Sequence, residues 1–153
     1  MSAAICPAIN DRRWKRLALI LGFIALSCGT APAQKPYTPA VGSAERKSIL
    51  DVLRVPFERE FKQNVKFDVS FFKVLNDWAF VLGAPENAQT GKKLRASPDI
   101  DPDFCGLLRK NARGEWAVIS HASGFGDPTY ADWPKKYGAP LRVFPEVIWN
   151  MQN

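Results

Sequence analysis

The feature that most constrains the fold is a pair of neighbouring stretches in which apolar and polar residues alternate. In residues 64–75 the apolar members of the pattern are Val65, Phe67, Val69 and Phe71. The doublet Phe71-Phe72 breaks the alternation and indicates a β-bulge. Asn76-Asp77 is a turn pair, and a second alternating stretch follows over 78–82. Because side chains of a strand alternate between its two faces, the pattern predicts a β-hairpin with a buried face.

A second hairpin is predicted by the same criteria. Residues 104–110 and 116–120 have strand character, and the turn residues between them end in Gly114. The segment 84–103 that separates the two hairpins is polar and rich in turn residues. It is too long for a tight turn, so we expect a mobile loop or a functional one. Two hairpins imply an antiparallel sheet.

Helical spacing of apolar residues precedes the first hairpin. Ser43 is a good N-cap residue, and the apolar residues that follow it recur at helical intervals. Pro56 clashes with the preceding helical turn and disfavours helix at Val55. The sequence therefore predicts one helix over 44–54 and a separate helical stretch over 56–62.

The last part of the chain has the composition of loops and short helices. Asp127 followed by Pro128 is a favoured helix start, and Gly138 can end that helix. Pro134 is expected to shorten or break the helix. Pro145 is expected to start a last helical turn.

The order of these elements defines the expected fold class. An N-terminal helix packed on a four-stranded antiparallel sheet of two hairpins, with short C-terminal helices, is a two-layer α+β domain. A cystatin-like fold and a reduced NTF2-like cone are both compatible with this order, which does not choose between them. We expect residues 1–33 to be a secretory signal peptide, 34–42 an extended linker and 43–153 the single domain.

The signal peptide is predicted from three successive features of residues 1–33. The basic residues of the first part are Arg12, Arg13, Lys15 and Arg16. The apolar run Leu17–Leu26 has only half of the roughly 20 residues that a transmembrane helix needs. Ala31-Pro32-Ala33 fits the cleavage site, so cleavage is expected between Ala33 and Gln34. The mature chain would then have no transmembrane span and would lie in a bacterial periplasm or be secreted.

A second form of export is also compatible with the leader. Ile24–Cys28 resembles a bacterial lipoprotein signal, in which Cys28 would be lipidated and would anchor the protein at the outer membrane. Arg12-Arg13 fits a twin-arginine signal, although the residues after the pair match that signal poorly.

Cleavage changes what the composition implies. The leader holds four basic residues and one acidic residue, so its net charge is +3. The whole sequence has a net charge of +6, and the mature chain therefore carries only +3. This balance gives no argument for nucleic acid as a partner. Of the three cysteines, Cys6 and Cys28 leave with the leader, and Cys105 alone cannot form an internal disulfide.

Several short elements together resemble a group of small exported bacterial proteins of unknown function. These elements are Arg46–Arg54, Asp77–Val81, Leu107–Lys110, Gly114–Val118, Gly126–Tyr130 and Tyr137–Pro140. The resemblance covers most of residues 43–145 and implies export and an α+β fold. It implies no activity and no role for any residue.

Candidate catalytic residues are few. His121, the single histidine, could act in a small hydrolase with Asp127 and with either Ser123 or Cys105 as the nucleophile. A surface histidine and a buried structural thiol are the simpler interpretations, because the sequence has no nucleophile-elbow motif. We therefore expect no cofactor and lean against enzymatic activity.

Metal sites of the common kinds are disfavoured. One histidine and one mature cysteine do not make a common zinc site. Asp99, Asp101 and Asp103 alternate like the start of a calcium loop, but Phe104 and Lys110 stand where an EF-hand needs Gly and Glu. The sequence therefore favours a solvated loop over a metal site here, with an irregular calcium site as the alternative.

Aromatic residues in the loop-rich segment 122–140 are the best candidates for a binding surface. The residues that we expect to form this surface are Phe125, Asp127, Tyr130 and Trp133. Aromatic side chains on loops can anchor a partner, or they can seal the open side of a small sheet. The sequence thus favours an exported binding or accessory domain without catalytic activity, whose partner is an envelope protein or a small ligand.

The export hypothesis predicts the first residue of the mature protein. Mass spectrometry of the protein purified from its host should find an N-terminus at Gln34. A mature chain that begins at a lipidated Cys28 would instead establish the lipoprotein alternative. An intact N-terminal Met1 in the envelope fraction would contradict both forms of cleavage.

Overall fold

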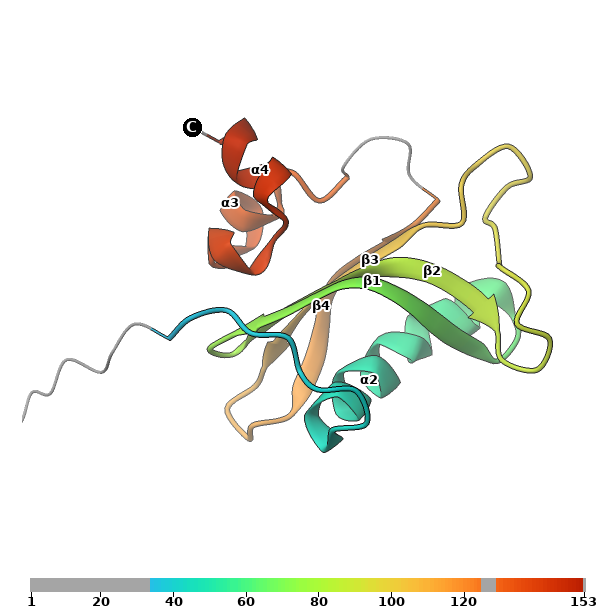
Figure 1. The fold of residues 1–153 in the computed structure, drawn as a ribbon, viewed down its shortest axis with the longest axis horizontal. Helices are drawn as coiled ribbons and strands as arrows, with labels where there is room; N and C mark the ends of the chain where they lie inside the picture. Colours follow the sequence, from blue (N-terminus) through green and yellow to red (C-terminus); the bar gives the residue numbers. More distant parts are fainter. Residues whose placement is uncertain (1–33, 125–128, 153) are drawn as a thin grey trace, which may run out of the picture. The chain divides into compact units, whose positions relative to one another are not determined.

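The computed structural model describes residues 34–124 and 129–152, and it confirms the α+β fold class. One long helix is followed by a four-stranded antiparallel sheet in the order β1-β2-β3-β4 and by short helices (Figure 1). The elements are α2 (Ala44–Phe61), β1 (Val65–Leu75), β2 (Trp78–Asn87), β3 (Phe104–Lys110), β4 (Trp116–Ser123), α3 (Trp133–Tyr137), the 3-10 helix η1 (Leu141–Val143) and α4 (Glu146–Met151).

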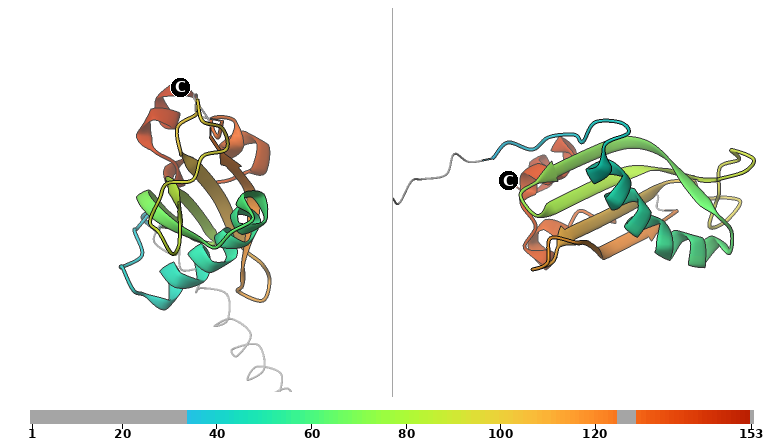
Figure 2. Two further views of the ribbon diagram at one scale, coloured as in Figure 1. Left: turned by 90° about the vertical axis from the view of Figure 1, so that its right-hand side faces the viewer. Right: turned by 90° about the horizontal axis from the view of Figure 1, so that it is seen from below.

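The sheet is covered on both faces, which the expected two-layer arrangement does not include. In Figure 1 and in the left view of Figure 2, α2 lies on one side of the sheet and α3 and α4 lie on the other. Residues Trp78 to Val81 of β2 are all buried, and so are the first five residues of β3. The two central strands therefore bury both of their faces, so each contributes side chains to two separate cores.

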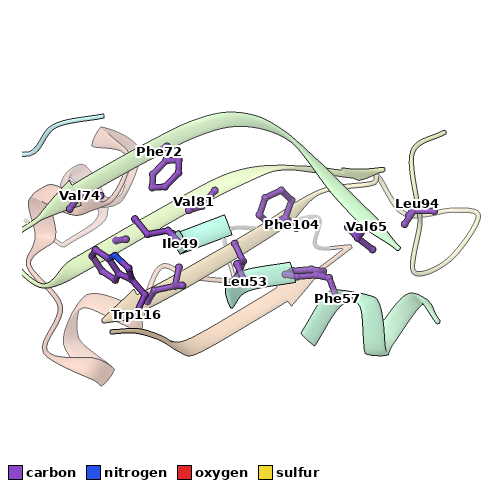
Figure 3. Close-up of a cluster of buried hydrophobic side chains, with 12 residues drawn as sticks. Ile49, Leu53, Phe57, Val65, Phe72, Val74, Val81, Leu94, Phe104 and Trp116 are labelled. Carbon is purple, nitrogen blue, oxygen red and sulfur yellow. The ribbon is translucent and has the colours of Figure 1, made fainter. Parts of the chain in front are cut away.

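The first core lies between α2 and the sheet, and we call it the helix core. Figure 3 shows the α2 side chains of Ile49, Leu53 and Phe57 facing the strands. The helix core consists of Ile49, Leu53, Phe57, Val65, Phe72, Val74, Ala79, Val81, Leu94, Phe104, Leu108 and Trp116.

The second core lies on the opposite face and is called the C-terminal core. It consists of Leu75, Trp78, Phe80, Cys105, Leu107, Tyr130, Trp133, Ala139, Val143, Phe144 and Ile148. Alternate residues of β2 contribute to it, so Trp78 and Phe80 pack here whereas Ala79 and Val81 pack in the helix core.

Helix α2 is continuous through Pro56, so the prediction of two helical pieces was wrong. A proline inside a helix costs about 3 kcal/mol. Three fully buried side chains, Ile49, Leu53 and Phe57, occupy one stripe of α2, and each contributes roughly 1.5–3 kcal/mol. Their burial outweighs the cost of the proline. The predicted N-cap is confirmed, since the Ser43 hydroxyl accepts a hydrogen bond from the Arg46 amide.

A β-bulge in β1 lies one residue before the predicted doublet. Val69 pairs with Gly83 and Phe71 pairs with Leu82, so Ser70 is the extra residue. The bulge reverses which side chains face α2. Phe72 therefore lies in the helix core, and Phe71 packs against the C-terminal core, on the face opposite to the one predicted.

The second hairpin contains a similar irregularity. β3 has the predicted bounds, but β4 continues to Ser123, three residues beyond the predicted end. Leu107 pairs with Ser120 and Leu108 pairs with Val118, so Ile119 is the extra residue on β4. The bulge keeps Val118 and His121 on the same face of the sheet, toward α2.

The two peripheral segments are more structured than predicted. β2 runs five residues beyond its predicted end, to Asn87, and Leu94 of the following loop packs in the helix core. The predicted linker 34–42 is extended, and it is also attached to β1. The backbone groups of Tyr37 and Val74 exchange hydrogen bonds of 2.9 and 2.8 Å.

The helix that contains Pro134 was predicted to be short or broken, and α3 is short, with only five residues. Pro134 lies in the first turn of α3, where a missing N–H costs nothing, and so it does not break the helix. Gly138 ends α3 with a φ of 66°, and α4 follows Pro145, both as predicted. The predicted helix start at Asp127 and Pro128 lies outside the described residues.

Gly106 permits the close packing of α2 on the sheet, and this generates a test. A Cβ atom at Gly106 would overlap the Leu53 side chain, whose Cδ2 would lie at 2.9 Å. We expect Gly106→Ala to lower the free energy of unfolding by about 1–3 kcal/mol because it overpacks the helix core. Denaturant titration measures this change.

The double variant supplies the control. In the background of Leu53→Ala the extra methyl group has room, so Gly106→Ala should cost much less there. Purely additive effects of the two substitutions would contradict this account of the contact.

Candidate binding groove beside strand β4

Of the residues predicted to form a binding surface, the structure describes Tyr130 and Trp133. Tyr130 and Trp133 are only 7% and 4% exposed and pack in the C-terminal core around Phe80. This position agrees with the alternative in which the aromatic side chains seal the open side of the sheet. Their burial gives no support to the hypothesis of a binding surface. Phe125 and Asp127 lie outside the described residues.

Two of the residues considered for hydrolysis, His121 and Cys105, lie on opposite faces of the sheet. His121 faces α2, where its ring lies 5.3 Å from the ring of Phe57. Cys105 faces the C-terminal core, on the other side of the sheet. The Ser123 hydroxyl donates a hydrogen bond to the Glu60 carboxylate of α2. A nucleophile must lie within hydrogen-bond reach of its base, and Cys105 cannot reach His121 through the sheet.

The thiol of Cys105 has the properties of a structural residue. Burial raises the pKa of the Cys105 thiol from 9.0 to about 12, and a hydrogen bond with the Ala122 backbone offsets this only in part. A thiol is nucleophilic as the thiolate. The raised pKa keeps this group protonated at neutral pH. In the ranges 34–124 and 129–152, no group of three or more His, Cys, Asp or Glu side chains could hold a metal ion.

A concave site lies between α2 and β4, and we call it the β4 groove. Its volume is about 620 Å³. The residues that line it are Val52, Val55, Pro56 and Arg59 of α2 and Trp116, Ala117, Val118, Ile119 and His121 of β4. Most of these side chains are apolar, and Val55 and Ile119 are 54% and 39% exposed.

The α2 side of the groove is a second stripe of the same helix. Val52, Val55, Pro56 and Arg59 have the spacing i, i+3, i+4, i+7, which places them on one helix face. The stripe lies beside the buried stripe of Ile49, Leu53 and Phe57. Helix α2 thus has a wider apolar surface than the sheet covers, and the uncovered part borders β4.

The β4 side of the groove is the edge of the sheet. Among the described residues no strand pairs with the outer side of β4, whereas the outer side of β1 pairs with Tyr37. The Lys110 amide donates to the Asp77 carbonyl at 2.8 Å, so the backbone groups of Lys110 point away from β4. Trp116 is the residue of β4 that pairs with Lys110. The N–H and C=O groups of Trp116 therefore point outward from the sheet, and so do those of Val118, two residues further along β4.

A second, smaller cavity lies beside the same edge, and we call it the basic pocket. Its volume is about 340 Å³. It is lined by Arg109, Lys110, Asn111, Ala112, Ala117 and Ile119, so it shares Ala117 and Ile119 with the β4 groove. The outer edge of β4 therefore borders two cavities.

Sequence reasoning missed the groove, although part of its signal was visible. The second apolar stripe of α2 can be identified once the helix is known to continue through Pro56. The prediction of a break at that residue hid the stripe, because it separated Val52 from Arg59. The edge position of β4 depends on where the C-terminal segment packs, and no local pattern encodes that.

Comparison of the chain with protein-family models, curated proteins and solved structures returns no match. The resemblance to small exported bacterial proteins therefore stays a prediction. None of the helices in the described residues has the length and apolar character that crossing a membrane requires.

The raised pKa of Cys105 predicts how stability depends on pH. The folded chain holds the thiol proton up to about pH 12, whereas the unfolded chain releases it above its ordinary pKa of 9.0. This contribution to stability is complete below pH 9.0 and is lost as the pH rises toward 12. We expect a loss of about 2 kcal/mol by roughly pH 10.5.

The measurement is the free energy of unfolding of the wild type and of Cys105→Ala as a function of pH. Tyrosine ionisation acts on both proteins. Because Cys105 also helps to raise the pKa of Tyr130, the difference between the two curves reports the thiol together with this effect. Curves that stay parallel through this range would contradict the buried, protonated thiol.

Proposed function

We propose that this protein is an exported binding domain without catalytic activity, which holds an extended segment of another protein in the β4 groove. The segment adds a fifth strand to the outer edge of β4, and its inward side chains fill the space between β4 and α2. One observation carries the proposal, namely that the outer edge of β4, which pairs with no other strand among the described residues, borders an apolar groove.

The two parts of the site supply different components of binding. Backbone groups at Trp116 and Val118 supply hydrogen bonds that fix the direction and register of the added strand. Exposed apolar surface at Val55 and Ile119 supplies affinity when it is buried. Strand addition beside a side-chain pocket is a general mode of peptide recognition.

Two other occupants fit the groove less well. In a second copy of the chain, the groove-facing side chains of β4, such as Val118, already pack against that copy's own α2. They would not enter the groove of a partner copy. The N-terminal segment 1–33 carries four basic residues. The only charged side chain that α2 contributes to the groove is Arg59, which repels basic residues, so this segment fits the groove less well.

The hydrolase alternative with His121 lacks a supporting arrangement among the described residues. The Ser123 hydroxyl is engaged by Glu60, and Cys105 is on the opposite face. His121 instead lines the β4 groove, where its ring contributes to the wall. The binding function accounts for this position of His121 without a catalytic role.

The proposal is tested with a defined probe, an acetylated octapeptide in which valine alternates with serine. Saturating peptide should slow the exchange of the Trp116 and Val118 amide hydrogens, because these outward groups become hydrogen-bonded. NMR-detected hydrogen exchange of the purified protein measures this. Protection confined to other strands, or no protection at all, would contradict strand addition at β4.

A matched pair of variants tests the groove. Val55→Asp should weaken binding of the same peptide at least about tenfold, because a carboxylate replaces apolar contact surface. Val147→Asp on α4 is the control, since Val147 is 51% exposed and Val55 is 54% exposed. Fluorescence titration gives both affinities, and denaturant titration should show stability changes within about 0.5 kcal/mol. Equal affinities of the two variants would exclude the groove.

A further inference from the structure

The cavities beside β4 also indicate the chemistry of the segment that they hold. Taken together, the residues lining the β4 groove and the basic pocket include Arg59, Arg109 and Lys110 and no Asp or Glu. Outside its first 33 residues the chain carries a net charge of only +3, and this total includes these three cations. Positive charge is thus concentrated where the proposed strand lies.

The positive charges are unequally available to a ligand. Lys110 lies 3.4 Å from the Glu45 carboxylate, and its ammonium group is 4.8 Å from the ring centre of Trp116. Arg109 is exposed and stacks on Trp78 with a distance of 4.9 Å to the ring centre. In the part of the chain that the structure describes, no carboxylate lies within ion-pair distance of Arg109.

Arg109 and the groove lie on opposite faces of the sheet. Arg109 pairs with Ala117, and its side chain lies over Trp78 of the C-terminal core. On the same face, the Tyr137 hydroxyl donates a hydrogen bond of 3.3 Å to Ser120 of β4. The Lys136 ammonium lies over the Tyr137 ring, so a second cation borders this side of β4.

Two further carboxylates near β4 lie outside the basic pocket. Glu115 precedes β4, and its carboxylate accepts a hydrogen bond of 3.0 Å from the Asn111 side chain. Asp132 lies at the N-terminus of α3, next to Trp133. Neither residue lines the basic pocket.

A strand added to β4 presents its side chains alternately to these two faces. One set of side chains enters the apolar groove beside α2, and the other set lies beside Arg109. We infer that the protein recognises segments in which apolar residues alternate with Asp or Glu. This inference rests on the proposed function, and it names the class of segment that the same site selects.

Three acetylated octapeptides test the inference, in which valine alternates with aspartate, with serine or with lysine. We expect the aspartate peptide to bind about fivefold more tightly than the serine peptide, and the lysine peptide to bind more weakly than both. Raising the salt concentration should reduce these differences, because exposed charges are screened. Titration calorimetry gives the affinities, and hydrogen exchange of the Trp116 and Val118 amides locates each peptide.

The source of the preference is tested with a matched pair of substitutions. Arg109→Gln retains most of the side chain that stacks on Trp78, and it should remove most of the preference for aspartate over serine. Arg142→Gln on η1 is the control, because Arg142 is also exposed but lies outside both cavities. The control should retain the preference.

The outcomes separate the two proposals. Equal affinities of the three peptides, each with protection of the β4 amides, would overturn the acidic preference and leave strand addition intact. The same holds if the lysine peptide binds most tightly at β4. A preference that Arg109→Gln leaves unchanged would overturn the role given to Arg109. Failure of every peptide to protect the β4 amides would overturn strand addition itself.

Discussion

The packing of Phe80 on β2 is the interaction on which the rest of the structure depends. Its ring centre lies 4.6 Å from that of Phe144 and 5.0 Å from that of Tyr130, and Trp133 packs against its edge. These contacts join the C-terminal segment to one face of the sheet, while Ala79 and Val81 on either side of Phe80 face α2. Because neighbouring residues of one strand serve two cores, neither layer can be lost without exposing the central strands.

Two bulges make this double-sided packing compatible with regular strands. Ser70 and Ile119 each add one residue to an outer strand, and each therefore reverses the faces of the residues that follow. Without the shift at Ser70, Phe72 would leave the helix core. Without the shift at Ile119, His121 would turn away from α2 and the groove would lose part of its wall. The bulges therefore shape both the cores and the binding groove.

The strands and turns could be predicted because they depend on local patterns. Alternation located β1 and the first parts of β2 and β4, and Asn76-Asp77 marked the turn of the first hairpin. The break predicted at Pro56 failed because the burial of Leu53 and Phe57 is a tertiary effect that outweighs a local cost. For a related reason, the sequence did not decide whether Tyr130 and Trp133 pack in the core or bind a partner. An aromatic residue in a loop-rich segment has the same local pattern whether its own chain or a partner covers it.

The position of the groove follows from where the C-terminal segment packs. After β4 the chain returns across the face opposite to α2, so η1 and the helices cover Phe80 and leave the outer side of β4 without a neighbour among the described residues. Exposed strand edges favour pairing with other chains, and proteins commonly limit this with bulges and charged side chains. β4 has both features, the bulge at Ile119 and the cation of Arg109 beside it. The bulge limits the length of a paired strand, and the cation selects its charge. Features that prevent indiscriminate pairing at this edge would thus also determine which segments can bind there.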